Sequence, residues 1–311
     1  MVSEKVKTKY EGRRAPWSGL GTDVRGAVDA SEVLDRSGLD WKVIQSPVYT
    51  DSGALIQGFK ANIRDVDSAI LGIVSDKYQI IQNEEAFAFT SDLIGKGLTF
   101  ETAGVFQGGR RTWIMAKMPE NYRMAGDEIS SYILFMNSHD GSCSVKVAMT
   151  PIRVACQNTL NLALSKASRI WSTRHTESVF IRMDEARETL FKAETYMSEL
   201  NNEIEQLRNI SLSNTKAIEY IDKFFPINAD MSPVQKQNTA MMRDRLIECY
   251  FEAPDLEGVG RNAYRFINAV SDFATHSEPL RKTKNYRENL FLNTAEGNPM
   301  IDRAYRMMLA A

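Results

Sequence analysis

The sequence predicts an α+β protein, in which a twisted antiparallel sheet is followed by a helical C-terminal region. In the first half, short strand-like apolar runs are separated by turn formers such as Asp51-Ser52-Gly53. In the second half, apolar residues recur at the 3.5-residue interval of a packed helix over residues 183–210. We therefore expect a sheet over about residues 41–150, backed by helices near 83–94 and 156–166.

Local signals place the individual elements of the first half. A helix is expected over residues 31–37 with Ser31 as its cap, and another begins at Asn83 with two glutamates in its first turn. The clearest β region contains a hairpin that turns at Gln107-Gly108-Gly109, and Pro151 marks the break that follows it. Residues 69–74 are a further apolar run. In chain order, the expected strands are residues 41–44, 55–63, 98–106, 110–118, 131–136 and 144–150.

One long helix dominates the second half. Its apolar seam repeats every four and three residues and consists of Ala186, Leu190, Ala193, Met197, Leu200, Ile204 and Leu207. Such a seam packs either on helices of the same chain or on another subunit, so a homo-oligomer is one expectation. Shorter helices are expected after Ser232-Pro233, over 262–273 and near 302–309. The predicted division is an extended basic arm (1–30), an α+β core domain (31–182) and a helical C-terminal region (183–311).

The composition is that of a folded protein. Of 311 residues, 43% are apolar and 25% are charged, which excludes intrinsic disorder of the whole chain. No apolar run approaches the roughly 20 residues of a membrane span, and the first residues lack the apolar stretch of a secretory signal. Three cysteines fit a reducing compartment without a disulfide framework. We therefore expect a cytoplasmic protein with no membrane partner.

The near-neutral net charge of −2 hides an uneven distribution along the chain. Residues 1–141 carry 16 basic and 19 acidic side chains, and residues 177–311 carry 17 and 21. The 35 residues between them carry five basic side chains and no acidic one. This segment is either a chance cluster on a half-buried element or an anion-binding face on an acidic body.

Catalytic signatures are weak in this sequence. Ser138-His139-Asp140 has the residue types of a hydrolase triad, but consecutive residues cannot assemble one. No phosphate-cradling loop or dinucleotide fingerprint is present. Four residues that zinc accepts lie within 37 positions but lack paired spacing: His139, Cys143, Cys156 and His175. We expect no enzyme, metal or cofactor, and interpret Asn137, His139, Asp140 and Gly141 as a tight turn or, alternatively, as a site.

A polyanion-binding surface fits the basic segment better. Arginine, lysine, amide and hydroxyl groups are the side chains that contact phosphates, and they are mixed over residues 142–176. Trp171 offers a face on which an unpaired base stacks, unless it lies in the core. The candidate nucleic-acid-binding residues are Arg110, Arg111, Lys146, Arg153, Lys166, Arg169, Trp171 and Arg174.

Several motifs make the sequence similar to a known family. They are Trp17-x-Gly-Leu-Gly21, Leu39-Asp-Trp41, Asn137-Ser-His-Asp-Gly141, Thr150-Pro-x-Arg153-Val-x-Cys156-x-Asn158-Thr159 and Arg174-His175-Thr176. On these, the chain resembles the phage/plasmid-like protein family, a domain of unknown function, from about residue 17 to the end of the long helix. The resemblance implies a gene of a mobile element in a bacterial host cell and implies no activity.

A looser resemblance concerns the order of elements. Hairpin, third strand and helix over residues 98–166 is the order found in single-strand annealing proteins, which implies a groove for extended single-stranded DNA. The leading hypothesis is a non-enzymatic single-stranded DNA-binding protein of a phage or plasmid, acting in replication or recombination. The alternatives are a module that binds a host protein to inhibit a defence or restriction system, and a nucleic-acid hydrolase that uses Asp140, His139 and His175.

Overall fold

Two antiparallel sheets and a helical region make up the protein, which confirms the predicted α+β class. The computed structural model describes residues 10, 13–88, 90, 97–164, 169–176 and 178–310, and only the backbone of residues 179–193. The larger sheet has the order β1-β5-β6-β7-β8-β10, with β9 also paired to β8. Its strands are β1 (Thr22–Asp23), β5 (Thr99–Phe106), β6 (Arg111–Met124), β7 (Asp127–Ser138), β8 (Val145–Arg153), β9 (Asn158–Thr159) and β10 (Ile170–Thr173).

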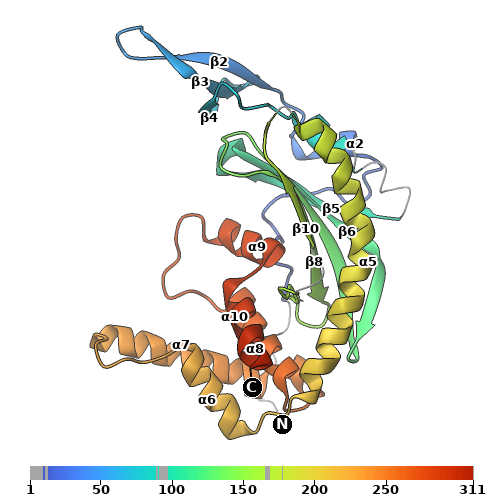
Figure 1. Cartoon of the computed structure of the whole chain (residues 1–311), viewed down its shortest axis with the longest axis vertical. Helices are drawn as coiled ribbons and strands as arrows, with labels where there is room; N and C mark the ends of the chain where they lie inside the picture. Colours follow the sequence, from blue (N-terminus) through green and yellow to red (C-terminus); the bar gives the residue numbers. More distant parts are fainter. Residues whose placement is uncertain are drawn as a thin grey trace.

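The residues expected to start the sheet form a second, separate sheet. It is a meander of three strands, β2 (Val43–Tyr49), β3 (Leu55–Arg64) and β4 (Ile70–Ser75). Figure 1 shows the β2–β3 hairpin extending away from the larger sheet. The single sheet predicted over residues 41–150 is therefore wrong in this respect. Strand pairing decides the number of sheets, and residue patterns do not encode it.

Helices cover both faces of the larger sheet. Phe87 of α3 (Asn83–Ala88) and Val33 of α2 (Ala30–Ser37) pack on one face, in a cluster with Ile114 and Phe135. Phe291 of α9 (Tyr286–Glu296) packs on the other face, in a separate cluster with neighbouring strand residues. Central strands are thus buried on both sides, which explains why they read as nearly continuous apolar runs.

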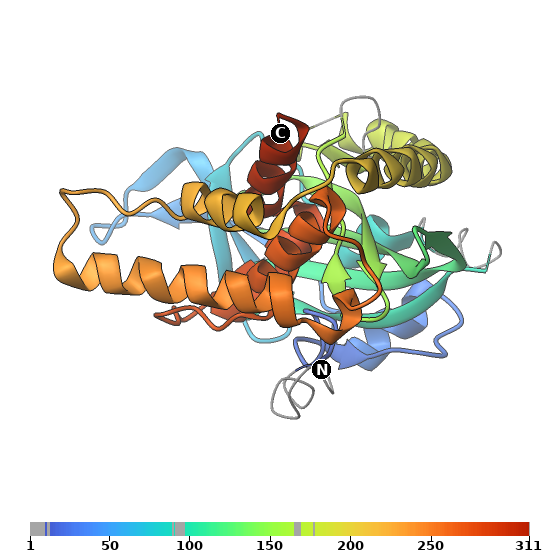
Figure 2. The ribbon, with the colours of Figure 1, turned by 90° about the horizontal axis from the view of Figure 1, so that it is seen from below.

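The helical region has its own core. It contains α5 (Val179–Asn209), α6 (Asn214–Phe224), α7 (Pro233–Glu252), α8 (Ala263–His276) and α10 (Pro299–Leu309). Helix α5 runs beside the larger sheet and down to this region, where α6, α7 and α8 gather (Figures 1 and 2). The seam residues Met197, Leu200 and Ile204 are buried in this core, so this part of the seam packs within the chain. No helix among the described residues is long and apolar enough to cross a membrane.

The helix predicted over 156–166 does not form in the described part of that segment. Cys156 lies in a turn, and Asn158–Thr159 pairs with β8 as β9. Residues 160–164 are irregular, and the Leu160 amide donates to the Pro151 carbonyl at 2.9 Å. Backbone pairing therefore outweighs an apolar spacing that also fits a helix. The strand–strand–strand–helix order expected from annealing proteins is consequently not completed here.

Candidate functional site

The turn at Asn137–Gly141 lies where β7 ends against the three-stranded sheet. Asn137 donates its amide to the Ile81 carbonyl at 2.9 Å. The Asp140 carboxylate accepts the Ser142 amide at 2.8 Å, and Gly141 has a φ of 73°, which favours glycine. These contacts stabilise a sharp turn. The chain then continues from this turn into β8.

His139 sits inside the junction between the two sheets. Asn62 of β3 donates to the His139 carbonyl at 2.7 Å, and the His139 Nε2 lies 2.9 Å from Asn83 Oδ1. Asn83 donates its own amide to the Leu39 carbonyl, so its Oδ1 accepts and His139 carries its proton on Nε2. Burial lowers the pKa of His139 to about 3. The imidazole is therefore neutral near pH 7 and is enclosed in the junction.

The junction also depends on a close backbone approach. A Cβ built on Gly72 of β4 would lie 2.6 Å from the Asp140 Cα. Real Cβ atoms do not come so near, and only glycine fits at this point without a shift. The Asn137–Gly141 turn thus fixes the three-stranded sheet on the larger one.

Arg174-His175-Thr176 reaches the same place from the end of β10. The His175 and Tyr78 rings stack with centroids 4.6 Å apart, and the Tyr78 hydroxyl donates to the Ser138 carbonyl at 2.6 Å. Gln79 donates its amide to the His175 carbonyl at 3.1 Å. Burial lowers the pKa of His175 to about 4, so this ring is neutral near pH 7.

These two motifs line an open pocket of about 340 Å³, which we call the motif pocket. Its cations are Lys77 and Arg174, both on exposed residues. Hydroxyl groups and the two stacked rings complete a lining that has no carboxylate among the described residues. The lining consists of Ser75, Lys77, Tyr78, Gly141, Ser142, Cys143, Ser144, Arg174, His175 and Thr176.

Two more predicted residues lie near the turn, and one of them, Arg111, contacts a residue that lines the motif pocket. The Arg111 Nε donates to the Ser142 hydroxyl at 3.0 Å. The carbonyl of exposed Arg110 accepts the His139 amide at 2.7 Å, which places Arg110 beside the turn. Arg174 therefore lines the opening and Arg111 contacts its Ser142, whereas Arg110 is placed beside the turn by its backbone carbonyl alone.

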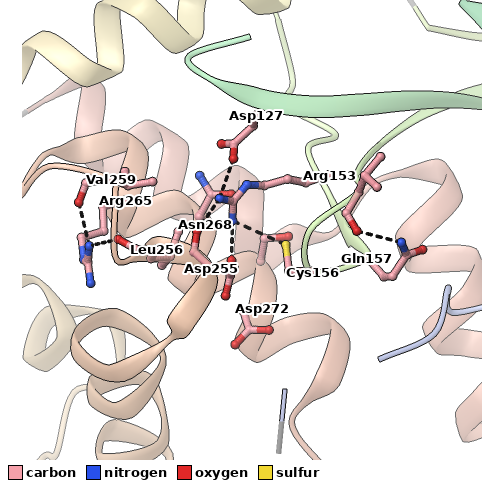
Figure 3. Close-up of polar contacts among 12 residues, drawn as sticks. Asp127, Arg153, Cys156, Gln157, Asp255, Leu256, Val259, Arg265, Asn268 and Asp272 are labelled. Atoms are coloured by element: carbon pink, nitrogen blue, oxygen red, sulfur yellow. Dashed lines mark hydrogen bonds and ion pairs between the residues drawn. The ribbon is translucent and has the colours of Figure 1, made fainter. Parts of the chain in front are cut away.

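Arg153 occupies a different place, in the interior. Its side chain is 1% exposed and forms ion pairs with Asp127 at 2.7 Å and with Asp255. It also donates to the Asp255 carbonyl at 2.8 Å, and Figure 3 shows the guanidinium between the two acids. The Tyr264 hydroxyl donates to the second Asp127 oxygen at 2.8 Å. Arg153 therefore joins the larger sheet to the helical region, and the prediction that it contacts phosphates does not fit this position.

Two other cations of the basic segment, Lys146 and Arg169, also have internal partners. Lys146 forms an ion pair with Glu296 at 2.6 Å. Arg169 donates to the carbonyls of Ala295 at 2.7 Å and Met149 at 3.1 Å. Trp171 is partly buried against the core cluster of the larger sheet, on the side away from α9. Lys166 lies outside the described residues. Lys146, Arg169 and Trp171 are not among the residues that line the motif pocket.

The comparison with protein families gives one match. The family model described as Domain of unknown function (DUF932) matches residues 70–295. The chain belongs to this family. No curated protein and no solved structure matches the chain.

The DUF932 match begins at the first residue of β4 and ends within α9. It includes every residue of the motif pocket and the Arg153 ion pairs, whereas β2 and β3 lie outside it. Within the described ranges, no group of three or more histidine, cysteine or acidic residues could hold a metal ion. At the pocket this chain places cations, hydroxyl groups and two aromatic rings together.

Sequence reasoning missed Lys77 and Tyr78. Both follow β4 in a short polar stretch, Asp76-Lys77-Tyr78, which has no motif of its own. The signal that would have found them is spatial, because they reach the pocket through the Tyr78 contacts with Ser138 and His175.

Proposed function

We propose that this DUF932 protein binds single-stranded DNA without catalysing a reaction, and that the motif pocket contacts its phosphates. The supporting observation is that Asn137–Gly141 and Arg174–Thr176, far apart in sequence, meet around a pocket with cations and hydroxyls but no lining carboxylate. A backbone phosphate carries one negative charge and accepts hydrogen bonds from such groups. The proposed setting is replication or recombination of a phage or plasmid in the cytoplasm of a bacterial host.

The cations form a short path around the motif pocket. Lys77 and Arg174 line it, and Arg111 contacts its Ser142 hydroxyl. These cations come from three separate segments of the chain and are offered to the phosphates of an extended strand. The half-buried Tyr78 ring, stacked on His175, supplies an aromatic group for an unpaired base. The Asp140 carboxylate nearby is engaged by the Ser142 amide.

Salt dependence tests the proposal. Fluorescence anisotropy with a labelled oligothymidylate, from about 50 to about 200 mM salt, measures affinity and its salt slope. The double variant K77A/R174A should bind at least about tenfold more weakly and reduce the slope of log K against log salt by about 1.4, because each single-strand phosphate contact contributes about 0.7.

The matched control is K216A/R281A, which removes one lysine and one arginine that are exposed elsewhere. It should leave the affinity and the slope close to those of the unaltered protein. No binding of the unaltered protein at low salt would overturn the proposal, and so would equal losses in the two double variants.

Binding of a host protein stays the alternative proposal. It needs an apolar or acidic surface separate from the motif pocket. The three-stranded sheet carries an apolar surface of that kind.

A further inference from the structure

The His175 ring, which lines the motif pocket, has one nitrogen without a hydrogen-bond partner. The residue is 7% exposed, and its Nδ1 lies 3.3 Å from the Gln79 carbonyl oxygen. A carbonyl oxygen can only accept, so Nδ1 carries the proton of the neutral ring and Nε2 is left as a hydrogen-bond acceptor. Among the described residues, none donates to this Nε2.

An unpaired acceptor inside a protein is costly. A buried polar group left without its hydrogen bond destabilises the fold, and each such group in a native structure requires an explanation. Protonation of the ring does not supply one, because burial lowers the pKa of His175 to about 4. The acceptor at this position therefore favours a bound group that donates an N–H or O–H to Nε2.

The base is the only part of an internal DNA nucleotide that can make this donation. A phosphodiester is ionised near pH 7 and a deoxyribose within a strand has no free hydroxyl, so both only accept hydrogen bonds. Every common base carries an N–H on its pairing edge, and proteins that take up an unpaired base read that edge by hydrogen bonds and stack the ring on aromatic side chains.

The space and the rings at His175 suit a base. The motif pocket has a volume of about 340 Å³, which lies within the range of sites that hold small organic molecules. The Tyr78 ring lies nearly parallel to the imidazole, at an angle of 13°, and its hydroxyl is fixed on the Ser138 carbonyl. A flat ligand beside the imidazole therefore has an aromatic surface next to it.

We infer that the motif pocket binds one unpaired base of the strand, whose edge N–H donates to the His175 Nε2, while Lys77 and Arg174 contact the adjoining phosphate. The inference rests on the proposed function and deepens it, because it names the part of the strand that enters the pocket. In a duplex the same N–H is bonded to the complementary base, so this contact also favours single strands.

A chemically altered strand tests the base contact on the unaltered protein. Fluorescence anisotropy at about 50 mM salt compares an oligothymidylate with a strand of the same length made of N3-methylthymidine. Methylation removes the single N–H of thymine and keeps the phosphates and the flat ring. The methylated strand should bind about tenfold more weakly, as expected for a buried acceptor left unpaired.

Two variants assign this difference to His175. H175F keeps a flat ring beside Tyr78 but has no acceptor, so it should bind the two strands with a ratio of affinities near one. The control H276Q alters a histidine at the end of α8, outside the pocket, and should keep the tenfold ratio. The comparison of the two strands on the unaltered protein does not depend on the folding of either variant.

The possible failures are distinguishable. Equal binding of both strands by the unaltered protein would overturn the inference, would mean that water satisfies Nε2, and would leave the proposed function standing. A tenfold ratio that persists in H175F would place the base contact elsewhere and would also overturn the inference. If neither strand binds at low salt, the proposed function fails and the inference fails with it.

Discussion

The His139 junction makes the stability of this protein sensitive to acid. The imidazole is buried, and its Nδ1 has no hydrogen-bond partner among the described residues. A proton added there would place a charge inside the junction with no acceptor for it. The pKa of His139 accordingly falls to about 3, mainly through burial, whereas an unfolded histidine titrates near 6.5.

The size of the effect follows from these two pKa values. Between about pH 6.5 and pH 3 the unfolded chain binds a proton at His139 and the folded chain does not, so the free energy of unfolding falls as the pH falls. At about pH 4.5 the contribution of this one group amounts to a loss of about 2–3 kcal/mol relative to neutral pH. His175 acts in the same direction, with its pKa lowered to about 4.

The variant His139→Gln isolates the contribution of this residue. Glutamine keeps an N–H donor for Asn83 but does not titrate, so the loss between pH 7 and about pH 4.5 should shrink by about 2–3 kcal/mol. Chemical denaturation of the variant and the unaltered protein at both pH values measures it. Asn62→Ala is the matched control, because it loosens the same junction without removing a titrating group. It should cost the same free energy at both pH values. A pH-dependent loss in His139→Gln equal to that of the unaltered protein would refute the reasoning.

Three further substitutions test the Arg153 ion pairs, the contact between Gly72 and Asp140, and the core of the helical region. Arg153→Met leaves two buried carboxylates without a cation and should cost about 3–5 kcal/mol by urea denaturation; a cost below 1 kcal/mol would contradict the ion-pair role. Gly72→Ala forces a Cβ against Asp140 and should cost about 1–3 kcal/mol, whereas Gly258→Ala, with open space around it, should be nearly neutral. Leu200→Ala should cost about 2–5 kcal/mol without changing the sedimentation behaviour, because this seam residue packs within the chain.

The fold was predictable where short-range signals and burial agree. The hairpin around Gln107–Gly109 forms as expected and a helix begins at Asn83 as expected, because turn formers and first-turn acids act locally. The described helix runs from Asn83 to Ala88, and residues 91–94 of the predicted helix lie outside the described residues. The segment after Cys156 was not predictable in this way. Its apolar spacing fits a helix, but Asn158 and Thr159 gain more from pairing with β8, and that pairing depends on strands already in place. The separation into two sheets has the same origin.

The candidate site shows a similar division. The residues of Asn137–Gly141 predict the turn by themselves. Its role as a junction depends on contacts with Asn62 and Asn83, which precede it by more than 50 residues. Lys77 carries no local signal and enters the motif pocket only through the contacts of Tyr78. Pairwise contacts between distant segments thus supply most of what the sequence patterns leave open.

The basic segment shows why the charge counted along the sequence does not predict the charge exposed on the folded surface. Residues 142–176 contain no acid, yet Lys146 and Arg153 are neutralised by acids that come from outside the segment. Arg169 is held by backbone carbonyls. Arg174 alone among the described cations of the segment stays exposed, and it joins Lys77 and Arg111 from other parts of the chain at the motif pocket. A local excess of charge predicts a binding surface only after the ion pairs that cross the fold have been subtracted, and of the described cations in this segment only Arg174, at the motif pocket, then remains.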